Sequence, residues 1–533
     1  MSLKDDSSSF SEDEKPQYAP AVVEAIHNWS YSGDPERPLE VYTEHRLHKS
    51  RFRWFWKVSQ FIDSFGEART VERLSSNRRV PLNFWSFVRL SGIWWGATCS
   101  LPSMTGFFLG PLLFGLSFKS SASSGVLGCF AGALVAAFGA TMGPQSGLRQ
   151  MMNARFQFGW WFSKFLALLN CLTLMGWLMV NGFFGGQLLS ALSNGSVSTE
   201  SGYGILFAVM LVITLFGMRI LQYFDTFFII PLFVAFLLCY VCAARDFDVQ
   251  HVSTVSGVEL NTAWVSFFQN CIGITSTWMA VASDYHLEWP ERTNRWVVFV
   301  YVLFAVFIPT AFVGVLGCGI ASAALYDEAK MAVYNNLGGA GLIVEEMRRW
   351  HGGGKFLVAL MYISLITNGG VTLYSFGMSI QTLALPLARF PRYLYAILGS
   401  VIWFVLTSVG SDHWSEVLSN FLPMIGYWSM IYFAVVAIET LWFRRRAKDD
   451  YEWDQYLNRK HFPMLYAAVL AFGFGVAGVV IGMDQYYYVG RLARVVGGGC
   501  ELGTLLAFGF TAVSYVPLRY IEIRLRNQPK IKP

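Results

Sequence analysis

The sequence predicts an all-α membrane protein with about twelve transmembrane helices. Of its 533 residues, 54% are hydrophobic and only 14% are charged, whereas about 25% of the residues of a typical soluble domain are charged. Apolar segments near the roughly 20 residues that a helix needs to cross a bilayer recur along the chain. We expect spans at about 91–118, 124–143, 160–190, 203–222, 226–244, 262–285, 296–322, 356–385, 392–410, 414–442, 463–483 and 498–520.

The chain before the first span is polar and differs from the rest of the sequence. Residues 1–15 are rich in Ser, Asp and Glu, which is typical of a disordered segment. The stretch RFRWFWKVSQFIDSF, residues 51–65, groups aromatic and aliphatic side chains at helical spacing beside Arg and Lys. This pattern predicts an interfacial helix on the inner leaflet. The alternative is a solvated linker.

Two spans carry signs of a break. The first contains Pro102 and Pro111 among several glycines, and the sixth opens with the polar run QNCIGITST, residues 269–277. Broken helices five spans apart are typical of transporters built from inverted repeats, where unwound backbone faces a substrate at the membrane midplane. The alternative is that Gly and Pro are simply frequent in membrane helices.

Single polar side chains stand in otherwise apolar spans. Asn181 lies within MGWLMVNGFFGGQLLSAL, residues 175–192, where an amide without a partner is costly. Comparable residues recur in other spans: Thr98, Asp284, Asn368, Glu439 and Glu501. Because these residues form no cluster typical of a catalytic centre, the pattern predicts a path for a small polar solute.

Three of these spans offer groups that could hold a planar solute. Trp278, in the broken part of the sixth span, presents a flat indole face for stacking; alternatively it packs against a neighbouring helix. Asn181 and Asn368 each carry two donors and one acceptor, which suits the edge of a nitrogen heterocycle. The alternative for each amide is an interhelical hydrogen bond.

Two carboxylates are candidates for proton coupling. Asp284 lies at the end of the sixth span, although it could instead face a hydrated loop, and Glu439 could instead pair with the arginines at 444–446. The sequence contains no HExxH, P-loop or GxSxG motif. We therefore expect no enzymatic activity, no metal site and no organic cofactor.

The distribution of charge predicts the orientation in the membrane. Most of the 40 Lys and Arg residues fall on one side of the predicted spans if the N-terminus is cytoplasmic, so both termini are expected inside. The sequon Asn194-Gly195-Ser196 then lies in an outer loop and is a candidate glycosylation site. A second sequon at Asn28 lies in the cytoplasmic tail and should be silent.

Five longer segments carry a resemblance to a known family: GPQSGLRQMMNARFQFG (143–159), GWLMVNGFFGGQLL (176–189), WMAVASDYHLEWPERTN (278–294), LPMIGYWSMIY (422–432) and GMDQYYYVGRLAR (482–494). In this order they resemble the nucleobase–cation symporter family, specifically its fungal purine–cytosine permease branch. The resemblance covers Trp94 to about Tyr520.

The resemblance implies a proton-coupled importer of a purine, cytosine or similar nitrogen heterocycle in the plasma membrane. It implies a cytoplasmic tail at 1–90, a five-plus-five inverted-repeat core with discontinuous helices 1 and 6 at 91–442, two further spans at 443–520 and a tail at 521–533. By motif, Asn181 matches the family's substrate-contacting amide and Trp278 its stacking aromatic. The expected partners are the heterocycle, a proton and the bilayer, without nucleic acid and with the oligomeric state open.

The sequence departs from the family pattern at two places. It has Gly96-Ala97-Thr98 where the family shows Ser-x-Asn, and Asn368-Gly369-Gly370-Val371-Thr372 where the family shows Asn-Asn-x-Pro-Asn. We expect Gly96, Thr98, Asn368, Gly369 and Thr372 to line the site with Asn181 and Trp278. Losing amides should shift the substrate preference, and the glycines should enlarge the pocket. The branch includes vitamin B6 transporters, so pyridoxine is the alternative substrate; a non-transporting membrane nutrient sensor is the alternative of another class.

Overall fold

The protein is described here by a computed structural model, which describes residues 71, 73, 74, 76, 79–215, 218–388, 390, 392–410, 414–444, 451–497 and 499–527. The expected interfacial helix at 51–65 and the sequon at Asn28 lie outside these residues. The longer helices are α4 (Phe84–Thr98), α5 (Leu101–Leu112), α6 (Phe118–Ala140), α9 (Arg155–Leu192), α10 (Thr199–Leu215), α11 (Met218–Ala243), α12 (Gly257–Ser276), α14 (Arg295–Leu325), α15 (Glu328–Met347), α16 (His351–Leu383), α18 (Arg392–Gly410), α19 (Trp414–Ile438), α20 (Tyr466–Gly482) and α22 (Gly503–Asn527).

Short elements connect these helices. They are α7 (Met142–Ser146), α8 (Gln150–Asn153), the 3-10 turn η3 (Thr277–Ala280), α13 (Ala282–Tyr285), η4 (Arg348–Trp350), α17 (Leu385–Ala388), a π-helical turn (Glu439–Phe443), η7 (Trp453–Gln455), η8 (Arg459–His461) and α21 (Arg491–Val495). Strands β1 (Asp484–Gln485) and β2 (Tyr488–Val489) form a small antiparallel hairpin in which Asp484 pairs with Val489.

The expected all-α membrane fold is confirmed. Among the described residues, eight helical stretches are long and apolar enough to cross a membrane, and α10 and α20 are shorter apolar helices. The broken pairs α4–α5 and α12–α13 supply the two spans that remain. Each of the twelve predicted spans therefore corresponds to a helix or to a broken helix.

The first span breaks after Thr98. Cys99 and Ser100 leave helical geometry, with Ser100 extended at φ −141° and ψ 156°, and Pro102 stands in the first turn of α5. The N–H of Leu101, at the start of α5, donates to the hydroxyl of Ser364 on α16 at 3.1 Å. Proline and this side-chain acceptor together account for backbone groups that a continuous helix would have paired.

The sixth span breaks without a proline. Helix α12 ends at Ser276, η3 tightens the chain over Thr277–Ala280, and Val281 has φ −132° and ψ −2° before the single turn of α13. Thr277 donates its hydroxyl to the carbonyl of Gly273 at 3.3 Å. Ser and Thr side chains can compete with the helix for backbone groups in this way.

The packing of the helices repeats between the two halves of the core. The second span of each half packs against the other (α6 with α14), and so does the third (α9 with α16). Helix α4 packs on α11, the last span of the first half, and α12 packs likewise on α19, the last span of the second half. This correspondence is that of a five-plus-five inverted repeat, with α20 and α22 packed on α19 outside it.

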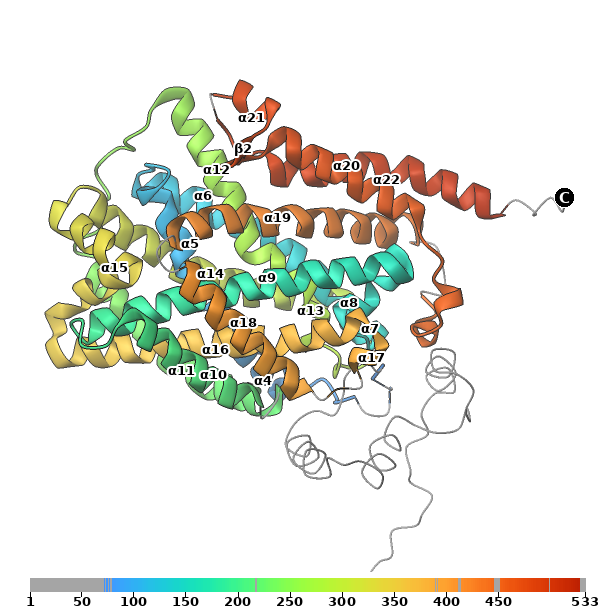
Figure 1. The fold of residues 1–533 in the computed structure, drawn as a ribbon, viewed down its shortest axis with the longest axis horizontal. Coiled ribbons are helices and arrows are strands. Elements are labelled where there is room, and N and C mark those ends of the chain that lie inside the picture. The colour runs from blue at the N-terminus through green and yellow to red at the C-terminus, as the bar shows by residue number, and fades with distance from the viewer. Residues whose placement is uncertain are drawn as a thin grey trace, which may run out of the picture.

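Figure 1 shows α15 at one end of the bundle and α7, α8, α13 and α17 towards the opposite end. Helix α15 was not among the predicted spans; it packs on α9, α14 and α16. Its chain bends at Gly338, where φ is +64° and an added Cβ would collide with Gln187. Only glycine readily adopts this conformation.

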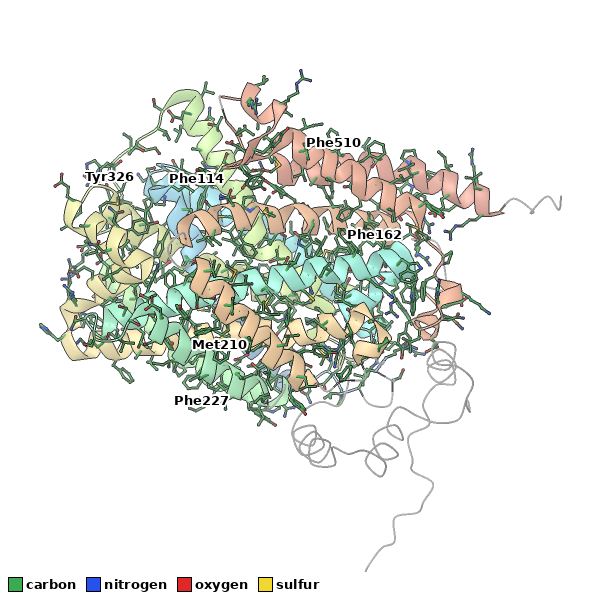
Figure 2. All side chains as sticks on the ribbon, in the orientation of Figure 1. Phe114, Phe162, Met210, Phe227, Tyr326 and Phe510 are labelled. Carbon is green, nitrogen blue, oxygen red and sulfur yellow. The ribbon has the colours of Figure 1, made fainter. Side chains whose placement is uncertain are left out.

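The outer surface of the bundle is apolar. Phe227 and Ile230 on α11 are each 71% exposed, and Phe510 on α22 is 38% exposed. Figure 2 shows Phe227 and Phe510 at opposite edges of the bundle. Such a surface is suited to lipid, because hydrocarbon tails solvate apolar side chains.

Candidate substrate site

A pocket lies where the two broken spans meet α9 and α16. It is lined by Ser103 of α5, by Thr173, Leu174 and Trp177 of α9, by Ile274, Thr277, Trp278 and Val281 of the sixth span, and by Asn368 and Thr372 of α16. None of these lining residues carries a formal charge. The pocket suits a small, neutral, partly polar solute.

Two indole rings form the aromatic part of the lining. Trp278 is half-buried in η3, and its ring meets the edge of Trp94 at 5.7 Å between centroids and an angle of 76°. Trp177, also half-buried, is contributed to the lining by α9. Trp278 thus has one edge fixed by Trp94 and remains part of the pocket wall, as a stacking residue requires.

Asn368 is held in place by both of its neighbours. Its amide N–H donates to the carbonyl of Ala97 at 2.6 Å, and its Oδ1 accepts from Asn181 Nδ2 at 2.8 Å. Asn181 also donates to the carbonyl of Trp177 at 2.9 Å and is completely buried. Asn181 therefore does not line the pocket itself but is hydrogen-bonded to Asn368, which does.

The threonine hydroxyls in the lining act mainly as hydrogen-bond acceptors towards a solute. Thr372 donates to the carbonyl of Asn368 at 2.8 Å, and Thr277 and Thr173 donate to carbonyls one turn earlier in their own segments. A hydroxyl that has donated its hydrogen keeps lone pairs that can accept. These side chains therefore favour a solute that brings its own O–H or N–H donors.

Besides Asn181, three further positions that were expected to line the site do not line the pocket. Thr98 is fully buried and donates to the carbonyl of Trp94 at 2.5 Å. A Cβ on Gly96 would lie 3.2 Å from Asp225, and one on Gly369 would collide with Met210. The expectation that these glycines enlarge the pocket is wrong, because both serve close packing between helices.

Asp284 is tied into the segment 143–159. Its carboxylate accepts from the backbone N–H of Gln150 at 2.7 Å and lies 3.5 Å from Arg149. Gln150 in turn accepts from Ser283 at 2.5 Å and donates to Tyr432 at 3.0 Å. The segment thus anchors α13, and the coupling role expected for Asp284 stays a prediction.

Glu439 lies on the contact between α19 and α22. It accepts from Arg519 at 2.7 and 3.0 Å, from Tyr515 at 2.8 Å and from Arg444 at 3.1 Å. The predicted pairing with the arginines that follow is present at Arg444, but Arg519 supplies the bidentate partner. The coupling role expected for this carboxylate stays a prediction too.

The candidate glycosylation residue is accessible. Asn194 is exposed just beyond the end of α9, with φ +54°. The sequon is therefore in a loop, as an acceptor site requires, and its modification stays a prediction.

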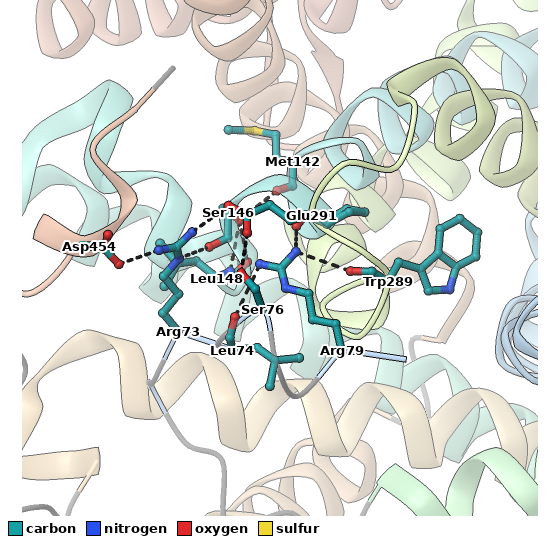
Figure 3. A network of polar contacts seen from close by, with 11 residues as sticks. Arg73, Leu74, Ser76, Arg79, Met142, Ser146, Leu148, Trp289, Glu291 and Asp454 are labelled. Carbon is teal, nitrogen blue, oxygen red and sulfur yellow. Dashed lines mark hydrogen bonds and ion pairs between the residues drawn. The ribbon is translucent and has the colours of Figure 1, made fainter. Parts of the chain in front are cut away.

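The end of the bundle beyond α13 is joined by a polar network (Figure 3). Arg73 donates to Asp454 at 2.5 Å, to Glu291 at 3.1 Å and to the carbonyl of Ser146 at 2.8 Å. Arg79 donates to the carbonyls of Pro144 and Trp289. The chain before α4 thereby connects the α7 loop, the segment after the sixth span and the segment around η7.

Sequence reasoning missed several lining residues. Ser103, Thr173 and Ile274 carry no pattern that separates them from other small or apolar residues of their spans. Trp177 and Thr277 had a local signal, since Trp177 stands one helical turn before Asn181 and Thr277 directly precedes Trp278. Side chains one turn apart share a helix face.

The chain is similar in sequence to known transporters. A family model described as permease for cytosine/purines, uracil, thiamine, allantoin matches residues 82–501. The vitamin B6 transporter TPN1 of Saccharomyces cerevisiae is 35% identical over 518 residues, covering 88% of this chain and 89% of the relative. The purine-cytosine permease fcyB of Emericella nidulans is 29% identical over 459 residues, covering 86% and 89%.

The fold is similar to that of Mhp1, a nucleobase-cation-symport-1 family transporter. The closed conformation with bromovinylhydantoin bound aligns with a TM-score of 0.64, covering 86% of this chain and 96% of Mhp1. The inward facing conformation aligns with a TM-score of 0.63. Because both are only 13% identical in sequence, the likeness shows the shared fold.

Proposed function

The chain belongs to the family of permeases for cytosine/purines, uracil, thiamine and allantoin, and from this premise we propose that it is a secondary importer of a small nitrogen heterocycle driven by a co-transported proton. The observation that carries the proposal is the uncharged pocket at the meeting point of the two broken spans. A site of that kind holds its solute by stacking and neutral hydrogen bonds.

Within this class, a B6 vitamer is the preferred substrate. Pyridoxine is a pyridine ring that carries three hydroxyl groups, each of which can donate to an oxygen acceptor. The pocket offers such acceptors on Thr277 and Thr372 and a stacking face on Trp278, but a single amide, Asn368, for the edge of a base. The 35% identity to a vitamin B6 transporter, against 29% to a purine-cytosine permease, supports the same preference.

A purine or cytosine is the second candidate. Asn368 has one N–H engaged by the carbonyl of Ala97 and one lone pair engaged by Asn181, which leaves one N–H and one lone pair for a base. A site that pairs a base through two bonds at one edge discriminates strongly against other rings. Asn368 is the only amide side chain in the described lining, and Ala97 and Asn181 already use part of its hydrogen-bonding capacity. We therefore expect this pocket to bind nucleobases more weakly than pyridoxine.

We propose that the protein lies in the plasma membrane, on the resemblance to the fungal permeases, and that both termini are in the cytoplasm, on the positive charges that flank the predicted spans. In that orientation the network around Arg73 lies at the cytoplasmic end and Asn194 outside. Proton coupling is proposed on the resemblance to the fungal branch, whose members couple uptake to protons.

The decisive experiment is competitive uptake in a fungal strain that lacks its own nucleobase and B6 permeases. Labelled pyridoxine, hypoxanthine and cytosine would be offered separately, with and without a protonophore, and then in pairs. We expect uptake of pyridoxine that a protonophore abolishes and that unlabelled nucleobases inhibit weakly.

Each other result contradicts a stated part of the proposal. Stronger uptake of hypoxanthine or cytosine would contradict the B6 preference. Uptake that follows a sodium gradient and ignores the protonophore would contradict proton coupling. Binding of pyridoxine without any uptake, in cells that display the protein at their surface, would favour the sensor.

A further inference from the structure

Asp225 is a buried carboxyl group to which no role has been given above. It lies in α11 and is completely buried, and neither of its carboxylate oxygens has a hydrogen-bond partner among the described residues. Phe227, two residues later, faces outwards with 71% of its surface exposed. Asp225 therefore occupies the face of α11 that points into the bundle.

The other buried acidic residues that the structure describes all have hydrogen-bond partners, although one oxygen of Glu346 has none. Each accepts at least one hydrogen bond from a charged or polar side chain: Glu346 from Lys330, Glu439 from Arg519, Glu501 from Tyr427 and Glu522 from Arg519. The two coupling candidates from the sequence, Asp284 and Glu439, have arginine partners. Among these groups Asp225 alone has no hydrogen-bond partner on either carboxylate oxygen.

Asp225 lies at the junction of α11 with α4 and α16. An added Cβ on Gly96 would lie 3.2 Å from both Cβ and Cγ of Asp225 and 3.4 Å from Thr367 of α16. One turn away on α11, Leu221 fills the space beside Gly370 of α16. The carboxyl group thus faces the end of α4, just before the break in the first span.

A continuous set of contacts links this junction to the substrate pocket. Thr367 donates to the carbonyl of Gly96 at 2.6 Å, and Asn368 donates to the carbonyl of Ala97 at 2.6 Å. Asn368 also lines the pocket. A shift of α4 relative to Asp225 would therefore move the hydrogen-bond acceptor of Asn368, the amide that lines the pocket.

No charged side chain that the structure describes is within hydrogen-bond reach of Asp225. On α4, Arg89 is seven residues from Gly96, about 10 Å along the helix. On α14, Tyr301 is engaged with Ser91 and the carbonyl of Phe87. The other ionisable residues on helices packed against α11 are Glu200 and Tyr203 on α10, Arg295 on α14, Glu328, Lys330, Tyr334, Glu345 and Glu346 on α15, and His351, Lys355, Tyr362 and Tyr374 on α16.

An ionised carboxylate without a partner is strongly disfavoured in a low-dielectric interior, whereas the protonated acid is tolerated there. We propose that Asp225 binds the co-transported proton and that its protonation allows α11 to close against α4 and α16. This assignment rests on the proposed proton-coupled import and goes beyond it by naming the carrier.

The proton balance of the step is simple. On the outer side the carboxylate takes a proton and becomes a carboxylic acid, whose O–H can donate to a backbone carbonyl near the α4 break. Release needs water at the oxygen atoms, so α11 must part from α4 and α16 towards the cytoplasm before the O–H bond breaks. The proton leaves on that side, and the carboxylate returns hydrated.

The test separates exchange from accumulation. Wild type, Asp225→Asn and the near-isosteric control Thr226→Val would be purified and reconstituted into liposomes with labelled pyridoxine and labelled hypoxanthine as probes. Thr226 is adjacent on the same helix, its hydroxyl is buried without a partner among the described residues, and it packs against Gly92 of α4. Thermal unfolding in detergent reports whether each variant is folded.

We expect Asp225→Asn to exchange substrate within about two-fold of wild type, because the amide mimics the protonated acid. Accumulation driven by an inward proton gradient should fall to a ratio of about 1, and the dependence of exchange on pH should disappear. Thr226→Val should accumulate substrate as wild type does. Where the amide variant does not insert, Asp225→Ser gives the same comparison with a smaller neutral side chain.

Proton-driven accumulation by Asp225→Asn that matches wild type would overturn the assignment. If a folded Asp225→Asn protein lost both exchange and accumulation, the assignment would also be overturned, because Asp225 would then be needed for binding the substrate. A wild-type protein that exchanges substrate but ignores the proton gradient would instead overturn the proposed coupling, which is a separate failure.

Discussion

At the scale of single residues, Trp278 has the clearest expected effect on transport. Its ring is fixed on one edge by Trp94 and lines the pocket with the rest of its surface. We predict that Trp278→Ala reduces uptake by about five-fold or more, because stacking on an indole contributes about 1–3 kcal/mol. Trp278→Phe should keep part of the activity, since a smaller aromatic face remains.

The measurement is initial uptake rate normalised to protein at the cell surface. Trp296→Ala is a matched control, because this indole is 72% exposed on α14 and lies outside the pocket lining. Normal transport by Trp278→Ala would mean that the ring is a packing residue and that the substrate lies elsewhere.

Specificity should depend on Thr372 more than on its neighbours in the sequence. The family pattern alone would direct Thr98→Asn, Val371→Pro and Thr372→Asn towards cytosine transport. In the structure only Thr372 lines the pocket, while Thr98 and Val371 are completely buried. We predict that Thr372→Asn alone raises cytosine uptake relative to pyridoxine, by about five-fold for one added hydrogen bond of about 1 kcal/mol.

This prediction is checked by the ratio of the two initial rates in the same cells. Thr98→Asn and Val371→Pro should mainly lower the amount of folded protein, since each forces a new group into a packed interior. A shift in the ratio caused by Thr98→Asn, with Thr372→Asn neutral, would contradict the observed lining.

The sequence predicted the residues of the site unevenly, for physical reasons. Trp278, Asn368 and Thr372 were expected and line the pocket, but the direction in which Gly96 and Gly369 face depends on helix rotation, which no pattern of residues fixes. Asp225 was missed because the expected spans ended at 222 and resumed at 226. The structure places it inside the continuous helix α11.

At the scale of elements, hydropathy predicted the spans and local chemistry predicted the two breaks. Helix α15 was missed because its sequence, EAKMAVYNNLGGAGLIVEEM, is short of apolar residues and bends at Gly338. It is held by ion pairs: Lys330 lies 2.8 Å from Asp246 and 2.5 Å from Glu346, and Arg349 lies 2.6 Å from Asp246. The pairs with Asp246 join α15 and the adjoining η4 to the loop after α11, and the pair with Glu346 links the two ends of α15.

The attachment of α15 should depend on pH through Asp246. Partial burial raises the pKa of this carboxyl, but the hydrogen bonds and charges of Lys330 and Arg349 outweigh burial and hold the pKa below its usual range. Its contribution to stability is therefore complete above the unfolded pKa of about 3.9 and is lost as the pH falls through the lower folded value.

We accordingly predict that Asp246→Asn lowers the thermal midpoint in detergent at pH 5 to 7 and that the difference from wild type shrinks below about pH 4. The exposed Asp454→Asn is a control, since that carboxylate is 71% exposed and its pairing should contribute little. A difference for Asp246→Asn that is the same at pH 3 and pH 7 would contradict this interpretation.

At the scale of the whole molecule, the pocket lies between two halves that repeat the same packing, and opening it requires these halves to move. At the end beyond α13, Arg73 and Arg79 join segments that are far apart in the sequence (Figure 3). Gln150 makes further buried connections at that end, because it bridges Ser283 and Tyr432. This end is therefore closed by side chains from the chain before α4.

Breaking the Arg73 contacts should favour the conformation that is open at this end. Arg73→Ala removes pairings with Glu291 and Asp454; because both carboxylates are partly exposed, the expected shift is about 1 kcal/mol, or about five-fold in population. The readout is the rate at which a maleimide labels Thr277→Cys from the side that we propose is cytoplasmic. All eight native cysteines are buried, so background labelling should be low.

The control is Arg292→Ala, which removes the same charge from an exposed position in the neighbouring segment. We expect faster labelling of Thr277→Cys with Arg73→Ala, an unchanged rate with Arg292→Ala, and protection by pyridoxine in both, because substrate occupies the pocket that Thr277 lines. Equal labelling rates in all three proteins would show that the network around Arg73 does not limit access to the pocket.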